Sequence, residues 1–420
     1  MGEVDYVKGL ESPNLMQIRA FLCVVDTGSV SKAAEALFRA QSAVTRSIIA
    51  LESRLGVSLF ERNASGMRLT RQGSSILPRA RRAVAELLDV SQLLGKSKEG
   101  AVEPLFLFQN RRLEIFVRLC ETQNMQTAAI TLGISQPAIS AAIKILEQGS
   151  GVNLFERTPQ GLLPTRVASG VLLRARRALN ELRHFDADIT FLDGTIQGVV
   201  HVGALPLGRT HILPQAIVRL TSQHPGVSVV TNESPFDLLA SELRSGDVDF
   251  VFGALRSSSY GSDLHGEELM QENLVILMRR NHPWAGRTVS PKLLASARWL
   301  LPRSGSPARE LLSAFFAHLG ISLPVPVVET GDLAILRGIL LNSDMLAAVS
   351  AHQLQYEIDS GELIPVPLVL NHTTRPIGLT YRAAALQSPA AHALMEMIRE
   401  VVAEIGRLAP EPTRNVTGSR

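Results

Sequence analysis

The sequence predicts two small domains of all-α type, followed by a larger α/β domain of two lobes. A stretch near the amino terminus returns 95 residues later without a gap, so that Phe60 matches Phe155. From Gly198 onward, short apolar runs alternate with helical patterns, which indicates α/β structure. A chain of 420 residues with 45% hydrophobic content exceeds a single core. We therefore expect three domains, at 14–95, 109–193 and 196–410.

The repeat covers a complete module. The pattern Ala-Ala-x-x-Leu-x-x-x-Gln-x-Ala occupies residues 33–43 and again 128–138, and Leu-Phe-Glu-Arg occupies 59–62 and 154–157. Between Leu15 and Leu87, roughly four positions in ten are identical in the second copy. The chain therefore contains two diverged copies of one module.

Each copy is predicted to begin with an amphipathic helix, because its apolar residues recur at helical spacing. A second helix follows, with paired small residues at Ala33-Ala34 and Ala128-Ala129 where helices approach closely. The apolar positions of the first helix are Leu15, Ile18, Phe21, Leu22 and Val25 in one copy, and Leu113, Phe116, Val117 and Cys120 in the other.

A turn and a third helix follow in the second copy. Gly133 allows the turn, Ser135 is placed to cap the next helix, and Pro137 is tolerated in its first turn. This arrangement is typical of a helix-turn-helix. The third helix would bury Ile139, Ile143 and Leu146 and expose Gln136, Ser140 and Lys144.

Two short extended runs around a glycine-containing turn complete each module. They span residues 56–71 in the first copy and 151–166 in the second, with Arg62, Arg71, Arg157 and Arg166 at their edges. Such a hairpin is typical of a wing that contacts the phosphate backbone of DNA. A long helix is expected to close each module, from about residue 72 to 94 and from about 168 to 191.

Both copies resemble the winged helix-turn-helix of LysR-type transcriptional regulators, which combines Ala-Ala-x-x-Leu, Ser-Gln-Pro-Ala-Val-Ser, Leu-Glu and Leu-Phe-x-Arg. The family usually carries one such module, so the duplication is a departure. The resemblance implies double-stranded DNA as a partner. It implies contacts from Ser31, Gln41, Ser42, Thr45, Arg46, Arg62, Arg71, Gln136, Pro137, Ser140, Lys144, Arg157 and Arg166.

The two copies depart from the family pattern in different ways. The first has Ala40, Ser42 and Thr45 where the family has Ser, Pro and Ser, but it keeps Arg46 at a DNA-contact position. The second keeps the Ser-Gln-Pro pattern but has Ala141 where that Arg would stand. We expect the first copy to bind more by charge and the second by helix fit, on an asymmetric operator. The alternative is that one copy has become a structural partner.

The carboxyl-terminal half is predicted to form parallel sheets in two lobes. Strands are expected at 199–203, 227–230 and 248–252, with helices at 212–223 and 236–243 between them. A second round is expected at 274–278, 299–302, 325–329 and 345–350. Two such lobes suggest a ligand cleft at the carboxyl ends of the strands.

This half resembles the effector-binding domain of the LysR family, which is itself similar to periplasmic binding proteins. The resemblance rests on His-Pro-Gly-Val at 224–227, Leu-x-x-Gly-Asp-x-Asp-Phe at 243–250 and His-Pro-Trp-Ala at 282–285. Segments 205–208 and 343–346 are most similar to the subgroup that controls a sugar-binding protein gene. The implied effector residues are Gly208, Arg209, Thr210, Ser234, Ser304, Gly305, Ser306 and Thr330, with a helix cap as the alternative role for Ser306.

Charge separates the two halves. Residues 1–190 hold 24 Lys and Arg against 18 Asp and Glu, whereas residues 191–420 hold 18 against 21. A basic amino-terminal half suits a polyanion. The expected partners are DNA, a small-molecule effector such as a sugar or an organic acid, and RNA polymerase. We expect no cofactor, no metal and no membrane association. We expect the protein to form a homo-oligomer.

Two other functions are weighed against a regulator. An enzyme lacks support, since the sequence shows no metal-spaced His pair, Gly-x-Ser-x-Gly elbow or phosphate-binding glycine loop. A secreted solute-binding protein would need a signal peptide, but residues 1–15 are charged, and two cysteines suit a reducing cytoplasm. In either alternative, the helix-turn-helix copies would serve only for assembly.

The long helices suggest how the copies meet. A linker of about fifteen residues, from Gly95 to Gln109, reaches up to ~50 Å when extended. One chain can thus pair its own modules, although pairing between chains remains an alternative. The expected contact joins Leu77, Val84, Leu87 and Leu88 to Leu172, Ala175, Leu179 and Leu182.

Overall fold

The computed structural model describes residues 12–63, 66–95, 103–159, 161–256, 262–368 and 370–408. The chain divides into two compact units. The first comprises the residues up to Gln197 together with 245–247, and the second comprises the rest from Gly198. Part of the linker, residues 96–102, lies outside the described residues, as do residues 1–11 of the amino-terminal segment and residues 409 and 410 of the expected third domain.

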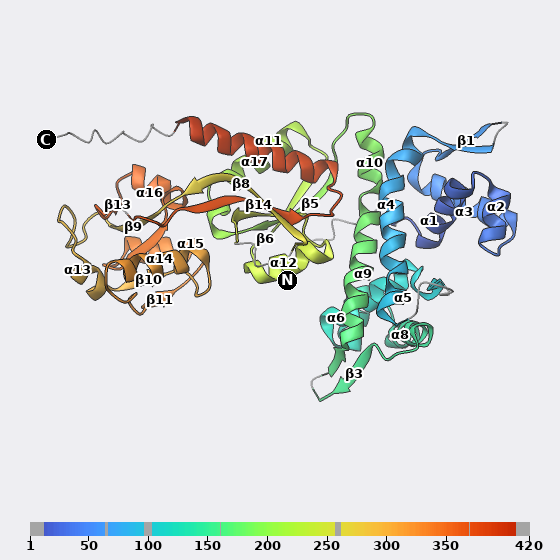
Figure 1. Ribbon diagram of the computed structural model, residues 1–420, viewed down its shortest axis with the longest axis horizontal. Helices are drawn as coiled ribbons and strands as arrows, with labels where there is room; N and C mark the ends of the chain where they lie inside the picture. The colour runs from blue at the N-terminus through green and yellow to red at the C-terminus, as the bar shows by residue number, and fades with distance from the viewer. Residues whose placement is uncertain are drawn as a thin grey trace. The chain divides into compact units, whose positions relative to one another are not determined.

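The first module has the predicted order of elements (Figure 1). A three-helix core precedes a hairpin and a long helix. In chain order the elements are α1 (Leu15–Thr27), α2 (Val30–Ala36), α3 (Gln41–Leu55), β1 (Phe60–Asn63), β2 (Gly66–Leu69), α4 (Arg71–Leu88) and α5 (Val90–Leu93).

The second module repeats this order after a short 3-10 turn, η1 (Leu105–Leu107). The prediction of one continuous closing helix per module is wrong. A single residue divides it into two helices, Asp89 in the first module and His184 in the second. The elements are α6 (Asn110–Thr122), α7 (Met125–Leu132), α8 (Gln136–Ser150), β3 (Phe155–Thr158), β4 (Gly161–Pro164), α9 (Arg166–Arg183) and α10 (Phe185–Phe191).

The two modules share one hydrophobic core, and α4 packs against α9 of the same chain (Figure 1). This contact confirms the expected pairing of the long helices within the chain. Val84 and Leu87 are buried on α4, as are Ala175 and Leu182 on α9. Leu88 was wrongly expected in the contact, since its side chain is 39% exposed.

The first lobe of the second unit is a five-stranded sheet in the order β6-β5-β7-β14-β8. The strands β5 (Gly198–Ala204), β6 (Val227–Asn232) and β7 (Phe250–Ala254) are parallel, as predicted. Helices α11 (Ile212–Gln223) and α12 (Phe236–Ser245) connect them, and α17 (Pro389–Leu408) packs against α11.

The second lobe is a five-stranded sheet in the order β11-β10-β12-β9-β13. Its elements in chain order are β9 (Leu274–Arg279), α13 (Pro291–Ser296), β10 (Trp299–Leu301), α14 (Pro307–His318), β11 (Val328–Glu329), α15 (Leu333–Leu341), β12 (Leu346–Ser350), α16 (Gln355–Asp359) and β13 (Leu363–Pro365). Two short 3-10 turns, η2 (Pro206–Arg209) and η4 (Ala351–Leu354), follow β5 and β12.

The prediction of parallel sheets is wrong in part, because both sheets are mixed. Strand β14 (Arg375–Arg382) runs antiparallel to β7 and to β8 (Leu264–Glu272), and β9 runs antiparallel to β12 and β13. Neither β8 nor β14 is a continuous apolar run, the pattern that marks a buried parallel strand: β8 is mostly polar, and β14 has Gly378 and Thr380 between its apolar residues. No single helix among the described residues is long and apolar enough to cross a membrane.

Candidate nucleic-acid interface and ligand cavity

Helices α3 and α8 present the side chains that sequence analysis assigned to base contact. We call these two helices the reading helices. On α8, Ile139, Ile143 and Leu146 are buried, while Gln136 and Lys144 are exposed, as predicted. Of the remaining predicted residues on the two helices, Thr45 is half-buried and Gln41, Ser42, Arg46, Pro137 and Ser140 are exposed. Both helices thus offer a polar face at the amino-terminal end, the end at which helix-turn-helix proteins contact base edges.

Neither reading helix begins with a side-chain cap. Ala40 precedes α3 and Ser135 precedes α8, and no side-chain cap bond forms at either position. The expected cap by Ser135 is therefore wrong as a hydrogen bond, although the residue occupies the capping position. Among the described residues, no side chain caps the amino-terminal end of either helix, which suits an anion such as a DNA phosphate.

A glutamate on each reading helix holds the start of the wing. Glu52 Oε1 accepts from the amides of Leu59 at 2.7 Å and Phe60 at 3.3 Å. Glu147 Oε1 accepts from the amides of Leu154 at 2.8 Å and Phe155 at 3.4 Å. These equivalent bonds explain the repeated Leu-Glu and Leu-Phe motifs, since the glutamate fixes the wing relative to the reading helix.

The tip of each wing lies close to the end of the first helix. A Cβ on Gly66 would come within 2.7 Å of the carbonyl oxygen of Gly28, and one on Gly161 within 2.8 Å of that of Gln123. Both glycines also have positive φ, at 123° and 128°, which L-residues with side chains rarely adopt. Glycine is thus required twice over at the same point of both modules.

The predicted phosphate contacts lie at the wings and at the ends of α4 and α9. Arg157 on β3 is exposed, and Arg71 and Arg166 are exposed at the first residues of α4 and α9. Ser31 is exposed on α2. The backbone of Arg62 lies in β1, and its side chain lies outside the described part of the chain.

The turn between α2 and α3 differs between the copies. Phe38 has φ of 52° and a side chain that is 96% exposed, whereas the equivalent Gly133 has φ of 63°. An aromatic residue in the left-handed region is strained, and its exposed ring gains no packing in return.

A cavity of about 440 Å³ lies in the second unit, with lining from both lobes. The first lobe contributes the turn after β5 and the segment before α12, and the second contributes the start of α14 and the segment before α15. Six of the eight residues predicted for the effector line it: Arg209, Ser234, Ser304, Gly305, Ser306 and Thr330.

The structure places the other two predicted residues outside the lining. Gly208 is buried, and a Cβ there would lie 2.6 Å from the ring of Phe252, so that glycine serves packing. Thr210 is exposed beyond the turn. Ser306 also has the capping role that was its alternative, since its Oγ accepts from the amide of Arg309 at 3.3 Å.

Sequence analysis missed most of the charge in the cavity. Arg256, Arg303 and Arg375 line it beside Arg209, against the acidic Glu233, Asp237 and Asp332. These arginines come from segments far apart in the sequence, and no local pattern marked them. A lining with four arginines and three acidic residues favours an anionic ligand.

Arg375 is the most deeply buried of these arginines, at 8% exposure. Its Nη2 donates to Ser350 Oγ at 2.8 Å, and Ser350 Oγ donates in turn to Glu272. Burial raises the pKa of Glu272 and lowers that of Arg375. The Nε of Arg375 has no hydrogen-bond partner among the described residues, which leaves a donor beside the cavity.

Arg209 is held more rigidly. Its Nε donates to the carbonyl of Ala204 at 2.7 Å and its Nη2 to that of Glu233 at 2.9 Å. Burial lowers its pKa. These bonds tie the turn after β5 to the segment before α12, so that Arg209 shapes the cavity wall as well as charging it. The described residues contain no group of three or more His, Cys, Asp or Glu placed to hold a metal ion.

Comparison with known proteins agrees with this geometry. Residues 15–74 and 110–169 each match the model of the bacterial regulatory helix-turn-helix proteins of the lysR family. Residues 193–403 match the LysR substrate binding domain. The chain belongs to the LysR family.

Among curated LysR relatives, HTH-type transcriptional regulator GalR of Pseudomonas putida KT2440 is 60% identical over 395 residues, 94% of this chain and 99% of the relative. An alignment of that length includes both modules. GbpR of Azospirillum brasilense is 28% identical over 69% of this chain and 85% of its own.

Solved LysR structures share the fold. The crystal structure of CbnR, a LysR family transcriptional regulator, superposes with a TM-score of 0.52 at 22% identity. It covers 70% of this chain and 99% of its own. A full-length OxyR variant from Pseudomonas aeruginosa gives a TM-score of 0.51 at 23% identity, over 70% of this chain and 94% of its own.

Proposed function

We infer that this chain is a ligand-responsive, sequence-specific DNA-binding transcriptional regulator that reads two unlike half-sites with one polypeptide. The observation that carries this proposal is the packing of α4 against α9 within one chain. In LysR-type regulators the corresponding helices come from two chains, so a single chain here has the two reading helices of a dimer. We expect no catalytic activity and a cytoplasmic location.

Two classes of contact to DNA are expected, one to phosphates and one to bases. Arg46, Arg62 and Arg157 would supply salt-dependent affinity for phosphates. Gln41, Thr45, Gln136 and Ser140 would select bases in the major groove. The reading helices differ at Arg46 and Ala141, which supports an operator whose half-sites are unlike and lie one or more helical turns apart.

Binding of the full-length protein to its own upstream DNA across a salt series tests this proposal. Arg46→Ala and Gln136→Ala should each weaken one footprint, and Arg46→Ala should also flatten the salt dependence. Arg287→Ala, at an exposed arginine of the second unit and outside both modules, is the matched charge control and should bind as the parent does. Equal binding by all three variants and the parent would contradict two-module reading and favour modules that serve only assembly.

For the effector, the four arginines of the cavity favour an organic acid over a neutral sugar. Titration calorimetry with a panel of organic acids and sugars should give binding by acids, with loss in Arg375→Gln. Arg287→Gln, at an exposed arginine outside the cavity lining, should bind as the parent does. Binding of sugars alone would reverse this assignment. The ligand would regulate DNA binding by changing the angle between the two DNA-binding modules. This requires that the ligand bind with different affinity to the protein in the two arrangements.

A further inference from the structure

The ion pairs between α4 and α9 repeat the shift of 95 residues that relates the modules. Arg79 on α4 contacts Glu181 on α9 at 3.1 Å. Adding the shift to one residue and subtracting it from the other gives Arg174 and Glu86, which are in contact at 2.7 Å. The pair of helices therefore has the reciprocal contacts of a two-fold interface.

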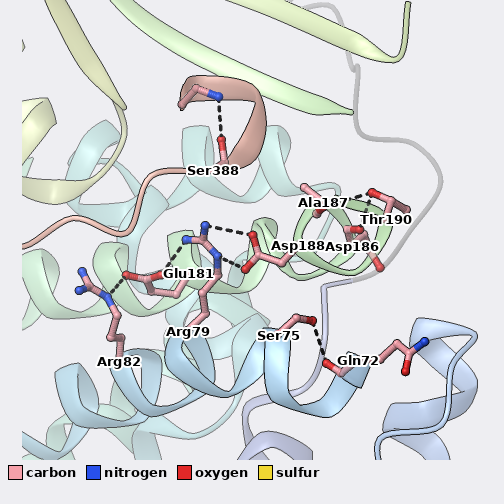
Figure 2. Close-up of polar contacts among 11 residues, drawn as sticks. Gln72, Ser75, Arg79, Arg82, Glu181, Asp186, Ala187, Asp188, Thr190 and Ser388 are labelled. Atoms are coloured by element: carbon pink, nitrogen blue, oxygen red, sulfur yellow. Dashed lines mark hydrogen bonds and ion pairs between the residues drawn. The ribbon is translucent and has the colours of Figure 1, made fainter. Parts of the chain in front are cut away.

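A second set of contacts is reciprocal in the same way. Arg82 contacts Glu181 at 2.7 Å, and its equivalent Arg177 contacts Glu86 at 3.6 Å. Figure 2 shows Arg79 and Arg82 on either side of Glu181. Pairs that are reciprocal would form equally well between two first modules or two second modules. They stabilise pairing without choosing the partner.

Some ion pairs between the modules have no reciprocal counterpart. Arg54, in the last turn of α3, donates to both carboxylate oxygens of Asp186 on α10, at 3.2 and 3.0 Å. The shift of 95 residues replaces Arg54 by Gly149 and Asp186 by Ser91. Both charged side chains are largely buried, at 17% and 33% exposure.

No charged side chain would fit at Gly149 in place of the arginine. A Cβ at this position would lie 2.3–2.8 Å from atoms of the Phe106 side chain, which η1 places against α8. The linker therefore fills, in the second module, the space that Arg54 occupies in the first. The asymmetry is built into the packing and is more than a difference of two surface charges.

The three possible pairings consequently differ at this point. Two first modules would place Arg54 against Ser91, and two second modules would place Asp186 against Gly149. Only the unlike pair brings the guanidinium to the carboxylate. Asp188, which also contacts Arg79 at 2.6 Å, disfavours only a pair of first modules, where Arg79 would meet Leu93. Asp89, which contacts Arg174 at 3.3 Å, disfavours only a pair of second modules, where Arg174 would meet His184.

We propose that Arg54 and Asp186 are the specificity pair that makes the first module select the second and reject a copy of itself. The reciprocal pairs supply affinity, and this pair supplies partner choice, as opposite charges do at the edge of coiled coils. The inference concerns protein pairing alone, so it stands or falls independently of DNA binding.

A disulfide assay on the full-length protein tests the proposal. The reciprocal ion pairs are centred on Ala83 and Ala178, both fully buried, so cysteines there report which helices face each other. The background replaces Cys23 by Ser and Cys120 by Ala, and adds Ala83→Cys and Ala178→Cys. After oxidation, peptide mapping separates the 83–178 product from the 83–83 and 178–178 products, and gel mobility shows whether the bond joins one chain or two.

With the natural charges, the 83–178 product should dominate. Arg54→Asp should raise the share of like products about tenfold, because it sets two carboxylates against each other in the unlike pair. The double reversal Arg54→Asp/Asp186→Arg should return the share to its starting value. Asp186→Asn provides a milder variant, with a smaller rise, should the reversal disturb folding.

Arg81→Asp is the matched control. Arg81 is an exposed arginine of α4 that pairs with Asp26 inside the first module, so its reversal should leave the product ratio unchanged. The same ratio in parent, single reversal and double reversal would overturn the proposal, as would an equal rise with Arg81→Asp.

Discussion

Phe38 shows at the scale of one residue how far the two copies have diverged. The turn needs a left-handed residue, and the second copy supplies Gly133 while the first keeps a phenylalanine with an exposed ring. Phe38→Gly should therefore raise the free energy of unfolding by about 1 kcal/mol through relief of strain. Phe38→Ala keeps the strain and removes only the exposed ring, so urea unfolding should place it near the parent. Equal stabilisation by both variants would show that the ring, and not the backbone, is the cause.

Cys120 provides a second test at this scale. Burial raises the pKa of its thiol from 9.0 to about 12. An unfolded chain therefore loses this proton above pH 9 while the folded chain keeps it, so the stability it contributes is intact below pH 9 and lost as pH rises toward 12. The loss should approach about 1.4 kcal/mol per pH unit.

Urea unfolding between pH 8.5 and 10.5, as an approximate working range, measures this effect. The parent should lose stability more steeply than Cys120→Ala, because the variant lacks the buried thiol. Parallel pH profiles would mean that Cys120 ionises normally in the folded protein.

At the scale of elements, the reciprocal ion pairs of α4 and α9 are equivalent in sequence but not in burial. Arg79 is 1% exposed and bonds Glu181 and Asp188, whereas Arg174 is 28% exposed. Arg79→Ala should cost about 3 kcal/mol, because it leaves buried carboxylates without their main partner. Arg174→Ala should cost about 1 kcal/mol or less. Denaturant unfolding of the two variants gives the comparison, and equal losses would contradict it.

Elements with a strong local pattern could be predicted from the sequence. The periodicity of Ile212–Gln223 gave the bounds of α11, and the repeat gave both helix-turn-helix units. Strands β8 and β14 could not be recognised, because neither is a continuous apolar run and their pairing joins segments over 100 residues apart. Arg375 escaped notice for the same reason, since only the tertiary fold brings it to the cavity.

The contacts of the long helices α4 and α9 show another limit of sequence analysis. No local pattern marks Arg79, Glu181 and Asp188 as buried, and it is their mutual pairing that allows them to be buried. Nothing in a single helix distinguishes these residues from exposed charges such as Arg81. The reciprocal pattern becomes visible only when the contacts are compared with the shift between the copies.

At the scale of the whole molecule, pairing within one chain predicts how DNA binding depends on concentration. The reading helices are already joined, so the pair should persist on dilution. Fluorescence anisotropy with DNA carrying one pair of half-sites should give an isotherm with a Hill slope of about 1. A slope near 2, falling to single-site behaviour with one half-site removed, would show that the modules of two chains must meet first.

The duplication of α3 and α8 in one polypeptide also has a genetic consequence. In a regulator built from identical subunits, one codon change alters both reading helices, and the operator must change at two places to match. Here each reading helix has its own codons. Under the proposed reading of two half-sites, half of the operator could therefore change while the other half holds the protein on its promoter, and new target sites would become reachable one mutation at a time.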